Sequence, residues 1–115
     1  MRDVIIFHNP KCSKSRETLE LLKSNKIQPE IIEYLKTPLN KDKLLQLMAL
    51  YKGDVRDFVR TKEDLFKELR PTITNKEEIA TLLEKHPKLM ERPLVVTSDR
   101  AAFGRPPEKV LELLT

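Results

Sequence analysis

Cys12 is the one cysteine in the sequence, and its surroundings favour nucleophilic chemistry. It follows an apolar run that ends in the turn pair Asn9-Pro10, and it precedes an amphipathic segment that begins at about Ser13, so a strand is expected to give way to a helix there. Unpaired N–H groups and the positive end of the helix dipole favour a thiolate at such a point, and the thiolate is the nucleophile. Lys11, Lys14 and Arg16 add positive charge. Many single cysteines are buried structural residues, but this position and these flanks predict a reactive one.

Three arginines, Arg60, Arg92 and Arg105, are candidates for an anion site beside that thiol. Guanidinium groups pair bidentately with the oxygens of tetrahedral oxyanions, and positive charge nearby stabilises a thiolate. Arg92 precedes one predicted strand, Arg105 follows another, and Arg60 ends a short predicted helix. Most single surface arginines are simply solvated, so the residues alone leave open whether these three converge on Cys12.

Composition narrows the class of protein. The 115 residues suit one domain, and 35% charged with 39% hydrophobic residues is typical of a globular protein. A net charge of +4, dispersed along the chain, favours a small anionic substrate over nucleic acid. We expect no membrane span, no secretory signal and no metal site, because the required runs and ligand spacings are missing. With one cysteine an intramolecular disulfide is impossible, so a reducing cytoplasm is the expected location.

The first third of the chain predicts a strand–helix–strand unit. Asp3 to Phe7 is typical of a buried strand, Ser13 to about Ser24 carries a helical apolar stripe, and Glu30–Tyr34 is a second short strand. A unit of this length implies a parallel strand pair with a right-handed crossover.

The remaining two thirds divide into a helical stretch and a second strand pair. From about 40 to 90 the pattern is helical, with Lys43–Lys52, a short helix capped by Asp54, Lys62–Leu69, and a helix behind a capping box at Thr74–Glu77. Two strands and a terminal helix follow, at Leu94–Thr97, Arg100–Phe103 and from Pro106. We expect Val110, Leu111 and Leu114 to face inward from the terminal helix.

The order of these elements predicts the fold class. We expect an α/β protein with a thioredoxin-like fold and a mixed four-stranded sheet (β-α-β, helical insertion, β-β-α). Residues 1–115 form one domain in this interpretation, with an all-helical insertion at about 40–90. In this layout a proline before the third strand faces the N-terminus of the first helix, and we predict a structural cis-proline at Pro93.

Three segments resemble those of the glutaredoxin-dependent arsenate reductase (ArsC) family, and the likeness runs through essentially the whole chain. They are the stretch from His8 to Arg16, the His86-Pro87-x-Leu89-x-x-Arg92-Pro93-Leu94-Val95-Val96 block, and Gly104-Arg105-Pro106-Pro107-Glu108. The resemblance implies that Cys12 attacks arsenate or a similar oxyanion and that Arg60, Arg92 and Arg105 hold it.

The same resemblance implies how the site is supported and supplied with electrons. His8, Ser15 and Arg16 are expected to support the thiolate. One protein thiol supplies only part of the two electrons that arsenate reduction needs, so the remainder must come from outside. In this family glutathione is the co-substrate and glutaredoxin the protein partner, with no tightly bound cofactor.

Two other functions remain open from the sequence. Spx-type transcription regulators resemble the same family, but they contact RNA polymerase and commonly carry a CxxC motif, whose second position here is Ser15. A glutaredoxin-like thiol transferase is the other alternative. Phosphatase-like arsenate reductases need a Cys-x5-Arg loop, which is excluded because Arg16 follows Cys12 by only four residues.

His86 shares an apolar helix face and precedes a proline, so we expect a packed or helix-capping histidine there rather than a catalytic one.

Overall fold

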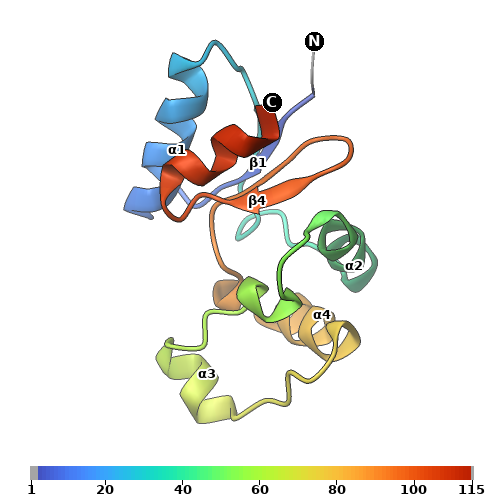
Figure 1. Ribbon diagram of the computed structural model, residues 1–115. Helices are drawn as coiled ribbons and strands as arrows, with labels where there is room; N and C mark the ends of the chain where they lie inside the picture. Colours follow the sequence, from blue (N-terminus) through green and yellow to red (C-terminus); the bar gives the residue numbers. More distant parts are fainter. Residues whose placement is uncertain (1–2, 115) are drawn as a thin grey trace. The chain divides into compact units, whose positions relative to one another are not determined.

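A four-stranded mixed sheet organises the N- and C-terminal parts of the chain in the computed structural model, which describes residues 3–114 (Figure 1). Its strands are β1 (Ile5–Phe7), β2 (Glu30–Ile32), β3 (Leu94–Val96) and β4 (Ala101–Phe103), in the order β2-β1-β3-β4. β1 runs parallel to β2 and antiparallel to β3, which is antiparallel to β4. This is the predicted α/β class with a mixed four-stranded sheet, although each strand is shorter than its apolar run.

One face of this sheet is covered by two helices that lie side by side, α1 (Ser13–Ser24) and the 3-10 helix η3 (Pro107–Leu114) (Figure 1). Ile6 and Val95 pair across β1 and β3 and point into the same cluster as Leu22 of α1. Val110 and Leu113 of η3 complete it. Fully burying an aliphatic side chain of this kind stabilises the fold by about 1.5–3 kcal/mol, so this cluster holds α1 firmly against the strand that precedes it.

The C-terminal helix differs from the prediction in the residues that it buries. The sequence pattern predicts a helix with Val110, Leu111 and Leu114 facing inward; the chain instead forms a 3-10 helix, in which Val110 and Leu113 are buried while Leu111 and Leu114 are half-buried. A 3-10 helix has three residues per turn, so positions i and i+3 lie on one face.

Residues 38–91 form a second compact unit, which contains helices and one isolated bridge between Val59 and Met90 within its described residues. Its elements are α2 (Lys41–Leu50), η1 (Val55–Phe58), α3 (Asp64–Leu69), α4 (Lys76–Lys85) and η2 (Pro87–Leu89). The first unit comprises the chain up to Thr37 and from Arg92 onward. The helical content of residues 38–91 is as expected; that the whole chain behaves as one domain stays a prediction.

The predicted capping box of α4 is wrong by one residue. The helix is capped by Asn75, whose side chain accepts a hydrogen bond from the Glu78 N–H at 2.9 Å, so the box lies one residue later than Thr74–Glu77. The Glu78 carboxylate returns to Thr74 and accepts from its N–H at 2.9 Å. Four neighbouring side chains can take part in capping, namely those of Thr74, Asn75, Glu77 and Glu78. The extended backbone conformation of Asn75 therefore decides which residue is the N-cap.

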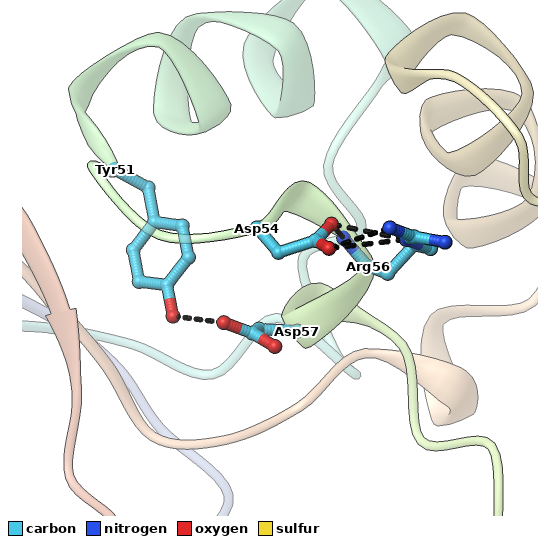
Figure 2. A network of polar contacts seen from close by, with 4 residues as sticks. All are labelled: Tyr51, Asp54, Arg56 and Asp57. Atoms are coloured by element: carbon cyan, nitrogen blue, oxygen red, sulfur yellow. Dashed lines mark hydrogen bonds and ion pairs between the residues drawn. The ribbon is translucent and has the colours of Figure 1, made fainter.

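The turn after α2 is held by the network in Figure 2. The Tyr51 hydroxyl donates to Asp57 at 2.6 Å, and Arg56 donates from Nη2 to Asp54 at 2.8 Å. Asp54 also caps η1, as predicted, by accepting from the Arg56 N–H at 2.9 Å. α2 ends at Leu50, before the predicted end at Lys52. The network therefore stabilises the turn that leads into η1.

Within residues 3–114, no helix combines the length and apolarity that a membrane span requires.

Candidate functional site: a thiolate at the start of α1

The loop between β1 and α1 places Cys12 at the N-cap of the helix, with extended backbone angles (φ −94°, ψ 124°). Asn9 shapes the turn: its carbonyl accepts from the Cys12 N–H and its side-chain oxygen from the Lys11 N–H, each at 3.0 Å. Arg16, which is exposed, donates from Nη1 to the Pro10 carbonyl at 2.9 Å. Arg16 therefore braces the loop backbone, and its support of the thiolate stays a prediction.

Cys12 is only 8% exposed, yet several positive groups surround its sulfur. Burial raises the pKa of the Cys12 thiol, but the Ser15 backbone N–H and the Arg92 and Arg105 guanidinium groups lower it more, so the net shift is downward. The Ser15 N–H lowers the pKa of Cys12, although its contact with the sulfur does not have the geometry of a capping hydrogen bond. Nη2 of Arg105 lies 3.6 Å from Sγ and donates to it. The site thus favours a thiolate, through a helix N-terminus and two cations together.

A lowered pKa has a measurable consequence for Cys12 alkylation. We expect its rate with iodoacetamide to rise with pH and to reach half of its plateau below the ~8.5 of a model thiol. The sign follows because deprotonation creates the nucleophile, so a lower pKa brings the reactive form to lower pH. A glutathione control in the same buffers calibrates the profile. A midpoint at or above that of the control would contradict thiolate stabilisation.

The β3 and β4 ends of the sheet supply the two guanidinium groups. Arg92 immediately precedes β3, and Arg105 follows β4 and donates from Nε to the Arg92 carbonyl at 2.8 Å. Arg105 thus joins the two strand ends and also reaches Cys12. The Arg92–Pro93 peptide bond is cis, as predicted, and so is the Arg105–Pro106 bond, which the sequence pattern does not indicate.

Gly104 allows this junction to lie close to α1. Its N–H donates to the Pro93 carbonyl at 3.0 Å. A Cβ added at Gly104 would overlap Thr18 Oγ1 and lie 2.9 Å from Cγ of Pro93. Thr18 is fully buried and donates to the Lys14 carbonyl in the first turns of α1. The sequence marks Gly104 only as part of the block from Gly104 to Glu108, because the close approach to Thr18 is a tertiary contact.

Replacing Gly104 with alanine should therefore damage both stability and the site. Overpacking in a well-packed region typically costs about 1–3 kcal/mol, and Thr18 and Pro93 would have to move to relieve it. We expect a lower urea midpoint and slower Cys12 alkylation at neutral pH. Gly53→Ala is a useful comparison, since the three atoms nearest to its added Cβ, at 2.8–2.9 Å, all belong to the Tyr51 side chain and to no backbone group. Unchanged stability in Gly104→Ala would show that the contact relaxes freely.

His8 and Ser15 form a buried pair beneath the loop. Nδ1 of His8 lies 2.6 Å from Ser15 Oγ, which also accepts from the Asn9 N–H at 3.0 Å. Burial lowers the pKa of His8, as do the charges of Arg16 and Lys23, while Glu33 opposes them. A neutral imidazole accepts from a hydroxyl at one ring nitrogen. The structure thus joins His8 to Ser15, and Ser15 to the backbone beside Cys12; their effect on the thiolate stays a prediction.

Arg60 lies in the second unit and is held there by carboxylates. Its Nε donates to Glu63 at 3.0 Å and its Nη1 to Glu91 at 2.6 Å. Its backbone N–H donates to the Leu89 carbonyl at 2.8 Å, and the Glu91 N–H donates to the Phe58 carbonyl at 2.8 Å. These contacts are all internal to residues 38–91, so a third guanidinium for the anion stays a prediction.

The sheet, the helix N-terminus and the cis-proline define a thioredoxin-like protein with one activated cysteine. Comparison with known proteins gives the family: the model of the ArsC family matches residues 7–113. The chain belongs to the ArsC family.

Individual relatives agree over nearly the full length. An arsenate reductase of Haemophilus influenzae is 46% identical over 96% of this chain and 98% of its own. The protein YfgD of Escherichia coli K12, which is uncharacterized, is 46% identical over 98% of both chains. The solved structure of an arsenate reductase from Vibrio cholerae superimposes with a TM-score of 0.90 at 45% identity, covering 96% of this chain and 97% of that one.

Proposed function

We propose that this protein is an arsenate reductase in which the Cys12 thiolate is the nucleophile. The observation that carries the proposal is the donation from Arg105 Nη2 to Cys12 Sγ at 3.6 Å, because it joins an activated thiol to a guanidinium suited to oxyanions. Relatives of similar length that are named arsenate reductases support the substrate. Arg92 and Arg105 would bind the oxyanion beside the sulfur, and Arg60 would be recruited as a third ligand.

The proposed reaction divides the two electrons between two thiols. The thiolate attacks arsenate, an S–As bond forms, and water leaves. A glutathione thiolate then attacks the Cys12 sulfur, the S–As bond breaks, and its electron pair goes to arsenic, which leaves as arsenite. Glutaredoxin reduces the resulting mixed disulfide and restores the Cys12 thiol. A free cysteine of this kind persists in a reducing compartment, so we place the reaction in the cytoplasm.

The test is NADPH consumption with arsenate in the presence of glutathione, glutaredoxin and glutathione reductase. We expect turnover that depends on arsenate and on every thiol component. A glutaredoxin-like transferase would instead turn over a small mixed disulfide, such as that of glutathione with cysteine, without arsenate. An Spx-type regulator would show neither activity and would bind RNA polymerase. Absence of arsenate-dependent turnover with all components present would overturn the proposal.

A further inference from the structure

The strand β2 lies at one edge of the sheet. In the order β2-β1-β3-β4 it pairs with β1 on one side, and within residues 3–114 no strand pairs with its other side. Ile31, the central residue of β2, is 44% exposed. Edge strands present backbone N–H and C=O groups that can pair with another chain. The outer edge of β2 is therefore a candidate surface for association.

Two hydrogen bonds fix which backbone groups of β2 face β1. The Glu30 N–H donates to the Val4 carbonyl, and the Ile32 carbonyl accepts from the His8 N–H, each at 2.8 Å. In a parallel pair the residues of one strand alternate between facing the neighbouring strand and facing away from it. Glu30 and Ile32 therefore face β1, and Ile31 between them directs both its N–H and its C=O outward.

The same alternation places one further outward group at each end of β2. The N–H and C=O of a trans peptide unit point in opposite directions. Because the Glu30 N–H and the Ile32 carbonyl face β1, the Pro29 carbonyl and the Glu33 N–H face outward. In chain order the outer edge carries an acceptor at Pro29, a donor and an acceptor at Ile31, and a donor at Glu33.

This order of donors and acceptors is complementary to itself. When a second copy runs antiparallel with Ile31 opposite Ile31, the two isoleucines exchange both hydrogen bonds, and each Glu33 N–H meets the Pro29 carbonyl of the other copy. The Glu33 carbonyl would then face Pro29, which has no N–H to donate. It needs none, because it already accepts from the N–H groups of Lys36 and Thr37, each at 2.9 Å. A two-fold arrangement thus satisfies every outward group.

A groove beside this edge adds apolar surface to the backbone pattern. Ile31 pairs with Ile6, which belongs to the cluster beneath α1, so Ile31 lies on the α1 face of the sheet. The groove has a volume of about 510 Å³ and is lined by Lys23, Lys26, Ile27, Gln28, Pro29 and Ile31. The two-fold arrangement brings the exposed Ile31 side chains of both copies opposite each other, which removes apolar surface from water.

Charge also favours a second copy of this chain. Glu33 continues the alternation of Ile31 and would lie opposite Pro29 of the second copy, at the groove that Lys23 and Lys26 line. In the single chain Glu33 pairs with Lys36 at 3.3 Å in an exposed ion pair, and such pairs contribute little. A carboxylate from each copy can therefore reach two lysines of the other. Complementary charges of this kind fix the register of an interface.

We propose that the outer edge of β2 is a self-association surface, on which a second copy of this chain pairs antiparallel about Ile31 and joins the two sheets. The surface is small, and interfaces that bury less than about 1,200 Å² are weak, so we expect a Kd of roughly 100 µM. The proposal uses no side chain that contacts Cys12, and it does not depend on the reaction that Cys12 performs.

The first test is sedimentation equilibrium of the full chain between roughly 10 µM and 1 mM at low ionic strength, a range that brackets the expected Kd. We expect the average mass to rise from that of a monomer toward that of a dimer. Amide hydrogen exchange over the same range supplies the location. Exchange at Ile31 and Glu33 should slow as concentration rises, because both outward N–H groups become bonded, whereas the Lys36 N–H, already bonded within the chain, should not change.

Charged substitutions at Ile31 test the register. Ile31→Lys and Ile31→Asp each place like charges directly opposite one another in the two-fold arrangement, so each should weaken association at least about tenfold. An equimolar mixture of the two variants should associate again, because opposite charges then face each other. Leu69→Lys is the matched control, since Leu69 is 42% exposed and lies in α3 rather than in β2. Its association should equal that of the unmodified protein.

Three results would overturn the inference. The first is a monomer at all concentrations, which would leave the edge to a different partner. The second is a dimer in which exchange at Ile31 and Glu33 does not slow. The third is a mixture of Ile31→Lys and Ile31→Asp that associates no better than either variant alone. Association restored only in the mixture would establish that Ile31 pairs with Ile31.

Discussion

Replacing Cys12 with serine is expected to abolish arsenate-dependent NADPH consumption, with a loss of at least ~1000-fold, or about 4 kcal/mol of transition-state stabilisation. A serine hydroxyl is not ionised at neutral pH, and it can form no disulfide with glutathione. The neighbouring groups that lower the Cys12 pKa cannot compensate for an absent sulfur. The measurement is the coupled assay at saturating arsenate, glutathione and glutaredoxin.

The control for Cys12→Ser is its fold. Cys12 is the N-cap of α1, and serine is a favoured residue at that position, so the urea midpoint should be unchanged or higher. The variant also has no thiol, since the sequence has no other cysteine, and a thiol titration confirms this directly. Residual turnover well above the background of the thiol mixture would show that the chemistry lies elsewhere.

Removing the Arg105 guanidinium should produce the second-largest effect. Arg105→Ala loses the donation to Cys12 Sγ and leaves the Arg92 carbonyl without the Arg105 Nε–H. Loss of one strong donor from an oxyanion site typically slows turnover by ~100-fold or more, equivalent to about 3 kcal/mol. We expect that loss in kcat, together with a higher pH midpoint for Cys12 alkylation.

Arg105→Lys separates charge from geometry. An ammonium group keeps the positive charge but has no planar fork, so it cannot reproduce the paired bonds to Sγ and to the Arg92 carbonyl. The alkylation midpoint should partly recover while turnover stays low. Arg56→Ala provides the control, because Arg56 is exposed and pairs with Asp54 in the other unit. Full activity in Arg105→Lys would reduce the role of Arg105 to charge alone.

Local features of the chain predicted much of the reactive segment. The apolar run, the Asn9-Pro10 turn and the amphipathic stripe predict β1, the loop and the bounds of α1, because each depends on contacts within a few residues. The parallel pairing of β1 with β2 follows from the length of the crossover. The residues alone made the arginines candidates, the resemblance to a family implied that they converge, and the structure brings Arg92 and Arg105 to Cys12.

Short segments with several candidate signals were harder to predict. Neighbouring residues with capping chemistry left the start of α4 uncertain by one position, and the last helix adopted a 3-10 geometry. Competing local conformations of this kind differ by small free energies, so packing against other elements decides between them.

By itself, the sequence determined that one thiol lies at the start of a helix, since strand, turn and helix signals there are local and agree. Only the tertiary structure decided which distant groups act on it. Arg105 reaches Cys12 across 93 positions of the chain, and Gly104 packs against Thr18. The carboxylate pairs of Arg60 likewise depend on Glu91, 31 positions away. The physical reason is that such contacts are set by how β3 and β4 pair and how segments pack, and spacing along the chain does not encode those distances.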